Sequence, residues 1–483
     1  MIADLKPYAE YKESGLPWLG QVPGHWAVER TKWRFRNRKE LNASGTHTNI
    51  LSLTLRGVVN NNPDDPEGLV PKDYRTYQFF AKGDLVFKLI DLENLRTSRV
   101  GLVHEDGIMS SAYVRLAPSN PTNIRYFFHQ FYDLYSRGIY NQLGAGVRST
   151  LGPSDLLNVG IVIPPPAEQA VIVRFLDWAN GRLERAILAK RKVIALLNEQ
   201  KQAIIHRAVT RGLDPSVPLK PSGIPWLGDI PQHWEVRRLR FAIDHYGPGI
   251  QMGPFGSSLT ELQSSETGFK LFGQENTISG DFTRGSRWIT KKQFEQLRKY
   301  ELVPGDIVLT RKGSIGKARL VPNGIPRGIV DSDTIRVRLD ERMVDRSFIV
   351  MLLHSSAYVQ RQLEATQRGA VLGGLNTATI GNLVLVLPPL PVQCTILADI
   401  REGTSALVAV ISRIEREIKL LREYRIRLVA DVVTGKLDVR EAAAKLPEET
   451  DKPEPLNAAD ALTERDEETG DADIDTVPEE AEA

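Results

Sequence analysis

SGLPWLGQVPGHWAVER, at residues 14–30, and SGIPWLGDIPQHWEVRR, at residues 222–238, are two copies of one segment. Eleven of the 17 positions are identical at an offset of 208 residues, and they include two tryptophans, two prolines and two glycines. The repeats of solenoid proteins recur every 20–50 residues or so, roughly a tenth to a quarter of this offset. The sequence therefore predicts two copies of a larger unit.

Three further motifs recur in the same order in each copy. They are G-D-[LI]-V at 83–86 and 305–308, the proline-rich strand ends IVIPPPAEQ at 161–169 and LVLPPLPVQ at 385–393, and V-T-x-x-L-D at 209–214 and 433–438. The intervening regions, 36–155 and 244–379, align only in fragments and carry short β-like runs between turn residues. Proline suits the first turn of a helix, so we expect a helix after each proline-rich strand end.

Each expected helix carries apolar residues in steps of three and four. That spacing, held over several heptads, predicts a coiled-coil seam, with an amphipathic helix lying on a domain core as the alternative. Lys190 and Lys201 occupy seam positions of the first helix and weaken its apolar series. We therefore expect this helix to pair with the second helix of the same chain, antiparallel to it, and not with a second copy of itself. The predicted seam residues are Leu183, Ile187, Ile194, Leu197, Ile204, Leu407, Ile411, Ile414, Ile418, Leu421 and Leu428.

The predicted fold class is α+β: two mixed α/β domains joined by two long antiparallel helices that form a coiled-coil spacer, with an internal pseudo-two-fold repeat. A helix over residues 172–208 would span about 55 Å at roughly 1.5 Å per residue. The predicted boundaries are 1–165 for the first mixed domain, 166–213 for the first helix, 214–389 for the second mixed domain, 390–440 for the second helix and 441–483 for an acidic, disordered tail.

The net charge of +2 hides a strong asymmetry along the 483 residues. Residues 441–483 hold 16 acidic and 3 basic side chains, which leaves +15 on residues 1–440. Such a basic body predicts a polyanionic partner, with scattered solubilising charge as the alternative. The single cysteine excludes a disulfide framework, and neither a membrane span nor a signal peptide is visible, so we expect a cytoplasmic protein.

Two basic domains on a fixed spacer suit double-stranded DNA, because dimeric DNA-binding proteins place two reading elements at a set distance along the duplex. Here one chain would supply both elements. Since the mixed regions differ, we expect two different half-sites, and the spacer limits their separation to about 16 base pairs at roughly 3.4 Å each.

In combination, these motifs resemble the specificity (S) subunit of type I restriction–modification systems over residues 11–440. The second mixed region adds GPFGSSL at 253–259 and TRKGSIGK at 310–317, and the first adds GDLVFK at 83–88 and GIMSSAY at 107–113. The resemblance implies that the mixed domains are target-recognition domains, each reading one half of an asymmetric bipartite DNA site.

The resemblance also implies the partners. The helices would dock two methyltransferase (M) subunits, and restriction/translocase (R) subunits would join for cleavage, in the prokaryotic cytoplasm and for phage defence. Adenine N6 methylation and ATP-driven cleavage would belong to those partners. We therefore expect no cofactor in this chain, with S-adenosylmethionine, ATP and Mg on the partner subunits, and no membrane partner.

No catalytic motif is evident in the chain. The proline pairs at 164–165 and 388–389 follow Ile163 and Leu387, not the Asn or Asp of an amino-methyltransferase loop, and no G-x-G-x-x-G follows a strand. Residues 313–317 fail as a phosphate-binding loop because Arg311 and Ala318 occupy required positions, so a hairpin turn or a close approach to DNA is the better interpretation. His25 and His233 lack further metal ligands at helical spacing, and we predict no metal site.

Two other functions remain as alternatives: a self-sufficient DNA methyltransferase or nuclease, and a basic scaffold that binds RNA or acidic protein. The repeated tryptophans, Trp18, Trp26, Trp226 and Trp234, are expected to anchor the junction between domain and helix or the methyltransferase interface. Cys394 is expected to be a small buried side chain.

Candidates for DNA contact are basic, amide and hydroxyl side chains in the two mixed regions, because Arg and Lys recognise guanine and Asn and Gln recognise adenine. A phosphate contact or a solvated surface is the alternative for each. The candidates are Arg75, Lys88, Asn94, Arg96, Arg99, Arg148, Ser257, Arg284, Arg311, Lys312, Lys317 and Arg368.

Overall fold

The chain divides into two compact units. The computed structural model describes residues 5–55, 57–62, 73–90, 92, 98–120, 122–144, 150–224, 227–244, 247–254, 268–312, 316–366 and 374–447. Within these residues, unit 1 combines 5–190 with 416–447, and unit 2 comprises 191–415. Each unit therefore takes part of both long helices, whereas the predicted boundaries followed chain order. Residues 448–483 of the predicted acidic tail lie outside the described part of the chain.

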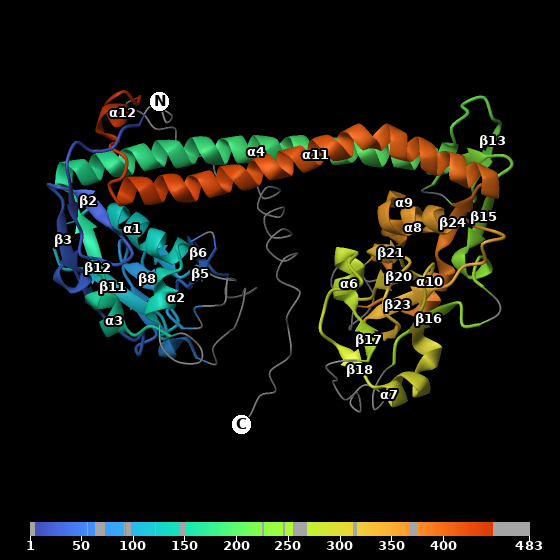
Figure 1. The fold of residues 1–483 in the computed structure, drawn as a ribbon, viewed down its shortest axis with the longest axis horizontal. Helices are drawn as coiled ribbons and strands as arrows, with labels where there is room; N and C mark the ends of the chain where they lie inside the picture. The colour runs from blue at the N-terminus through green and yellow to red at the C-terminus, as the bar shows by residue number, and fades with distance from the viewer. Residues whose placement is uncertain are drawn as a thin grey trace. The chain divides into compact units, whose positions relative to one another are not determined.

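Unit 1 contains a four-stranded antiparallel sheet in the order β4-β11-β8-β9. Shorter antiparallel pairs are formed by β1 with β2, β3 with β12, β5 with β6 and β7 with β10. In Figure 1 the first elements of unit 1 are blue to cyan. The bounds are β1 (Tyr11–Glu13), β2 (Gln21–Pro23), β3 (Ala27–Arg30), β4 (Phe35–Asn37), β5 (Leu51–Thr54), β6 (Gly57–Asn60), β7 (Gln78–Phe80), β8 (Leu85–Phe87), β9 (Val100–Leu102), β10 (Gly107–Met109), β11 (Val114–Pro118), α1 (Ile124–Ser136), α2 (Ile139–Leu143), α3 (Pro153–Asn158), β12 (Gly160–Ile163) and α12 (Arg440–Ala444).

Unit 2 contains two four-stranded sheets, in the orders β16-β23-β20-β21 and β18-β17-β22-β19, and the second includes the parallel pair β17 and β22. Two further antiparallel pairs join β13 with β14 and β15 with β24. The bounds are β13 (Leu219–Pro221), β14 (Asp229–Pro231), β15 (Glu235–Arg238), β16 (Ile250–Met252), β17 (Phe269–Phe272), α6 (Gln274–Ser279), β18 (Trp288–Ile289), α7 (Lys291–Gln296), β19 (Glu301–Leu302), β20 (Ile307–Thr310), β21 (Ala318–Leu320), β22 (Gly328–Val330), β23 (Thr334–Val337), α8 (Arg346–Ser355), α9 (Ala357–Ala365), α10 (Thr377–Asn382) and β24 (Val384–Leu387).

The repeat extends into the regions that align only in fragments. The sheets β4-β11-β8-β9 and β16-β23-β20-β21 have the same order, and their registers match as well. Leu85 lies opposite Leu102 and Leu116, while Ile307 lies opposite Leu320 and Val337. The mixed regions therefore share a framework and differ in what is added to it.

The repeated G-D-[LI]-V motif supplies the start of a central strand in each sheet. Its aspartate caps the turn before the strand: Asp84 accepts from the backbone N–H of Ala81 at 2.7 Å, and Asp306 accepts from that of Val303 at 3.0 Å. Each aspartate also pairs with an arginine, Asp84 with Arg115 at 2.6 Å and Asp306 with Arg338 at 2.7 Å. Burial raises the pKa of Asp84, and the guanidinium of Arg115 opposes that rise.

Trp26 and Trp234 anchor the junction between domain and helix, as predicted. They are 0% and 1% exposed. Each packs against a glycine in the left-handed conformation just after a long helix: a Cβ at Gly435 would lie 3.1 Å from Trp26 Cζ3, and one at Gly212 would lie 3.1 Å from Trp234 Cζ2. Trp18 is half-buried, and Trp226 lies outside the described residues.

The long helices are α4 (Pro166–Arg211) and α11 (Leu390–Val433). Both begin at the proline-rich segments, and they end before the predicted 213 and 440 because a positive-φ glycine follows each last turn. In unit 1 they are antiparallel, since Glu184 pairs with Arg425 at 2.9 Å and Lys190 with Glu417 at 2.6 Å. Lys190, expected to weaken the seam, instead forms an ion pair at its edge.

The predicted seam residues are all buried or half-buried. Leu183, Ile187, Ile411, Ile418 and Leu428 are at most 8% exposed, whereas Leu196 and Leu420 on the same helices are more than half exposed at 64% and 62%. Leu428 also belongs to the core of unit 1. The seam interpretation therefore agrees with the burial along the helices, and the domain-core alternative applies at their ends.

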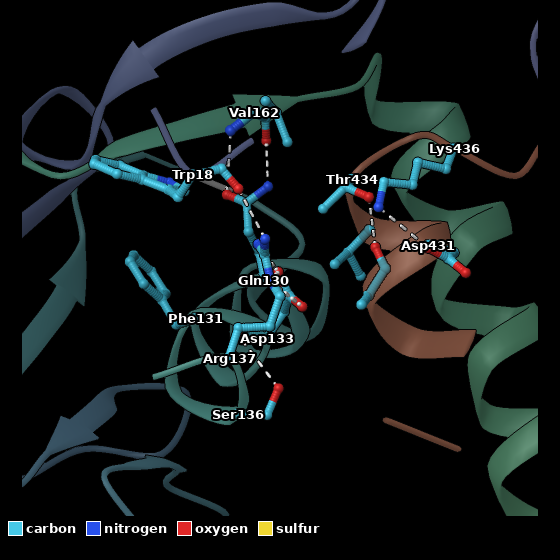
Figure 2. A network of polar contacts seen from close by, with 12 residues as sticks. Trp18, Gln130, Phe131, Asp133, Ser136, Arg137, Val162, Asp431, Thr434 and Lys436 are labelled. Atoms are coloured by element: carbon cyan, nitrogen blue, oxygen red, sulfur yellow. Dashed lines mark hydrogen bonds and ion pairs between the residues drawn. The ribbon is translucent and has the colours of Figure 1, made fainter. Parts of the chain in front are cut away.

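Polar contacts tie α1 to the repeated segment and to strand β12 (Figure 2). Gln130 donates to the carbonyl of Val162 at 3.0 Å and accepts from its N–H at 3.2 Å. Arg137 bridges the carboxylate of Asp133 and the carbonyl of Trp18, the latter at 2.9 Å. In unit 2, Gln362 forms the same pair of bonds with the backbone of Val384, at 3.0 and 2.9 Å. The two units are thus braced in similar ways.

A buried histidine on α1 predicts that unit 1 loses folding stability at acid pH. Burial, assisted by the charge of Arg125, lowers the pKa of His129 from its usual 6.5 to about 4, and its Nε2 is inaccessible with no partner among the described residues. Because the unfolded state binds the proton more tightly, the stability of unit 1 should fall by roughly 1–3 kcal/mol as pH drops from about 6.5 towards 4.

Amide hydrogen exchange of unit 1, followed by mass spectrometry across that pH range, measures this effect. The variant His129→Gln should lose part of the pH dependence. His104→Gln is the control, because the side chain of His104 is 46% exposed. Equal pH profiles for His129→Gln and the native chain would contradict the assignment.

Candidate nucleic-acid interface

Four strands of unit 2 end at one edge of its two sheets. The loops that follow β16, β17, β20 and β22 begin at Gly253, Gly273, Arg311 and Asp331. The loops touch: a Cβ at Gly253 would lie 2.1 Å from the carbonyl oxygen of Asp331, so only glycine fits there. The backbone N–H of Lys312 also donates to Gln274 at 3.3 Å. We refer to this set of loops as the strand-end edge of unit 2.

Three predicted DNA contacts lie on the β20–β21 connection at this edge. Arg311 is half-buried and donates to the carbonyls of Leu375 at 3.1 Å and Ser332 at 3.4 Å, so it holds neighbouring loops together. Lys312 is exposed and pairs with Asp333 at 3.2 Å. Lys317 is exposed, and its backbone bonds to Thr310 across the hairpin. Strands β20 and β21 pair as a hairpin, which agrees with the turn interpretation of this segment.

Two arginines lie on the segment between α6 and β18. Arg284, a predicted contact, is exposed. Arg287 was not selected from the sequence. Its Nη2 donates to Glu275 at 2.9 Å and to Asp331 at 2.9 Å, and its side chain is 46% exposed. Burial raises the pKa of the Asp331 carboxyl, and the Arg287 guanidinium opposes this; the two carboxylates in turn raise the pKa of Arg287 against its own burial.

Unit 1 places its described candidates differently. Arg75 is exposed, in a turn of 3-10 helix that Asp73 caps by accepting from its backbone N–H at 2.9 Å. Lys88 is half-buried, and its backbone N–H donates to the carbonyl of Arg99 at 3.1 Å. This bond closes the β8–β9 hairpin, as the backbone bond between Thr310 and Lys317 closes the β20–β21 hairpin.

The prediction that Arg99 contacts DNA needs a correction. Its side chain is 0% exposed, so in this structure it lies in the interior and presents no donor to a DNA surface. It was selected by residue type, which does not reveal on which side of a hairpin a side chain lies. The remaining candidates lie outside the described residues: Asn94, Arg96, Arg148, Ser257 and Arg368.

Cys394 is exposed, not buried as predicted. It lies near the start of α11, and its Sγ is 4.0 Å from the carboxylate of Asp345. Across the described ranges, no group of three or more His, Cys, Asp or Glu side chains is placed to hold a metal ion. None of the described helices combines the length and hydropathy of a membrane span.

Unit 1 also carries a groove of about 620 Å³ on its helices. Its lining includes exposed apolar side chains of α11, Leu420 at 62% and Tyr424 at 40% exposure. Four charged residues also line it: Lys190, Glu417, Glu423 and Arg427. Leu420 and Tyr424 are four residues apart and so lie on one face of α11, and adjoining exposed apolar side chains favour contact with another protein.

Comparison with known proteins gives a consistent result. Residues 56–190 match the family described as type I restriction modification DNA specificity domain. The chain is 25% identical over 346 residues to the type I restriction enzyme MjaVIII specificity subunit of Methanocaldococcus jannaschii, covering 69% of this chain and 75% of that protein. It is 23% identical over 314 residues to the StySPI specificity subunit of Salmonella potsdam, covering 63% and 62%.

A solved chain from a type I R-M system shares the fold. It superposes with a TM-score of 0.52 at 15% sequence identity, over 86% of this chain and 99% of that chain. At this identity the likeness concerns the architecture alone: mixed domains joined by long helices.

Proposed function

We propose that this chain, a member of the specificity subunit family of type I restriction–modification systems, reads the DNA sequence for its complex and performs no chemistry itself. The observation that carries the proposal is the repeat. Each unit has the same four-stranded framework, but unit 2 adds the sheet β18-β17-β22-β19 where unit 1 has the pairs β5-β6 and β7-β10. Equal frameworks with different additions suit two different half-sites of one bipartite target.

The helices would set the gap between the half-sites. Both α4, with 46 residues, and α11, with 44, are continuous. Continuous helices that pair along a buried seam resist bending, so they support a gap of constant length. The length of that gap remains a prediction.

The partners would be two methyltransferase subunits, with restriction/translocase subunits added for cleavage. The groove at Leu420 and Tyr424 supports a protein partner on the helices. Methyl transfer would need S-adenosylmethionine, and cleavage would need ATP and Mg; we place all three on the partner subunits. An assay of the purified chain for methyl transfer tests this division, and cofactor-dependent turnover by the chain alone would contradict it.

Exchange of one unit's insert tests the reading function. Replacing residues 36–155 with the corresponding region of another specificity subunit should change one half-site and leave the other half-site and the gap unchanged. The measurement is sequencing of methylated adenines in cells that carry the chain and its partner subunits. The reciprocal exchange of residues 244–379 is the matched control. A change in both half-sites after a single exchange would contradict independent reading.

A further inference from the structure

The segment 281–287 of unit 2 is an exposed loop held in place by two buried side chains. Lys270 on β17 is 1% exposed, and its ammonium donates to the backbone carbonyls of Thr283, at 3.3 Å, and Gly285. Asn276 on α6 is 0% exposed, and its amide donates to the carbonyls of Asp281 at 2.9 Å and Arg284 at 3.0 Å. Four backbone carbonyls of this seven-residue loop are therefore held by buried side chains.

Burying a lysine and an asparagine beneath a loop costs free energy, and a loop that only connects two elements does not need such a support. Burial lowers the pKa of Lys270, because an ammonium group out of water is less stable in its charged form. Binding sites repay that kind of cost, because a contact residue on a rigid support loses less entropy when its ligand arrives. The rigid support therefore favours ligand contact by the side chains that the loop exposes.

Arg287 ends the loop and is itself fixed. Its Nη2 is held between Glu275 and Asp331, both at 2.9 Å, and Asp331 is 6% exposed. Gly273 makes room for this arrangement, since a Cβ there would lie 1.9 Å from Nη2. Every described hydrogen bond and ion pair of Arg287 leaves from Nη2, so Nε and Nη1 remain to donate elsewhere. The side chain is 46% exposed, which lets a ligand reach them.

The loop belongs to the strand-end edge of unit 2. Asp331, which pairs with Arg287, lies in the same β22–β23 loop as Asp333, which pairs with Lys312. Arg284, Arg287, Lys312 and Lys317 thus lie on adjoining loops, although Glu275, Asp331 and Asp333 offset part of their charge. A flexible lysine is sufficient for phosphate, whereas a braced guanidinium suits an acceptor at one fixed position, such as a base edge.

We propose that Arg287 reads a guanine in the half-site of unit 2, with Lys270, Asn276, Glu275 and Asp331 as its positioning residues. Guanine offers two acceptors, O6 and N7, in the major groove, and Nη1, which takes no part in the described contacts of Arg287, can donate to either of them. The proposal rests on the DNA-reading function proposed above and names the base class that this site recognises.

The test compares Arg287→Met with Arg327→Met in the full chain with its partner subunits, using sequencing of methylated adenines. Arg327 is the matched control, because it precedes β22 at the opposite end from Asp331, is 61% exposed and also pairs with a carboxylate, Glu301. Arg287→Met should relax selection at one guanine of the unit 2 half-site by about 10- to 150-fold, the loss of one hydrogen bond from a charged donor, with the other half-site unchanged. Arg327→Met should leave the motif intact.

A second variant separates reading from folding. Arg287→Met leaves Asp331 without its cation, so Arg287→Met combined with Asp331→Asn removes the unpaired buried charge and should show the same relaxation. An unchanged motif, or a uniform fall in methylation at every site, in this double variant would overturn the role of Arg287. If the native chain itself gave no bipartite motif, the proposed function would fail as well, so the two failures are distinguishable.

Discussion

Trp26→Ala is expected to destabilise unit 1 by about 3–5 kcal/mol. The indole is 0% exposed, stacks edge-on to Tyr8 with ring centroids 5.7 Å apart, and donates from Nε1 to Glu168 at 3.2 Å. Glu168 also accepts from the hydroxyl of Tyr8 at 2.6 Å. The substitution removes the packing against Gly435 and leaves a buried carboxylate with one donor fewer. Amide exchange in unit 1 measures the loss locally, which avoids assuming that two units unfold as one.

Trp33→Ala is the matched control for this prediction. Trp33 lies in the same unit and is 62% exposed, so its removal should change stability by less than about 0.5 kcal/mol. Trp234→Ala should reproduce the large effect in unit 2, where the indole is 1% exposed. Similar losses for Trp26→Ala and Trp33→Ala would contradict the role of the repeated tryptophans as anchors.

The second large effect is expected at the repeated aspartates. Asp84→Ala should cost about 3–5 kcal/mol, because it strands a buried cation: the side chains of Asp84 and Arg115 are only 5% and 4% exposed. Arg115 would keep its bond to the carbonyl of Phe79 at 2.8 Å. Glu40, 3.5 Å away, is 66% exposed, so water screens its charge and it compensates little.

Asp306→Ala provides the comparison within the same molecule. Both aspartates cap the same turn, so the loss of the cap is shared, but Arg338 is 31% exposed and can regain water. We therefore expect a smaller cost, about 1–3 kcal/mol, measured by exchange of unit 2 amides. Equal costs at the two positions would show that the cap, not the stranded guanidinium, dominates.

Several features of the fold could be predicted from sequence because local chemistry encodes them. The proline-rich segments predict where α4 and α11 begin. The spacing of apolar residues by three and four positions predicts which side chains are buried along these helices. The tryptophans of the repeat were recognisable as anchors because large aromatics recurring in a Pro/Gly frame are rarely exposed. Their partner glycines, Gly212 and Gly435, follow the helices in both copies.

The shared four-stranded sheet was not visible in the sequence. Its strands are only three to five residues long in unit 1, too short to show a period, and their side chains pair with partners far along the chain. Sequence alignment of the mixed regions therefore found fragments where the structure has one framework.

The candidate site shows the same limit. Residue type selected Arg284 and missed Arg287, three positions away, because what distinguishes Arg287 is its partners: Glu275 and Asp331 lie 12 and 44 residues from it. Residue type also selected Arg99, which is buried. Without the fold, an arginine that packs inside and one that is braced at the surface have the same sequence signature.

The division of the long helices between units sets an order for biosynthesis. Unit 2 is formed from one continuous stretch of the described chain, residues 191–415. The core of unit 1, in contrast, packs Tyr8 and Trp26 with Leu428 and Val432, and Lys6 forms a β-bridge with Asp438. The ribosome delivers the first residues of unit 1 long before the last ones. The amino-terminal half must therefore wait, with apolar surface uncovered, while the later half is completed, which makes the nascent chain a natural client for chaperones.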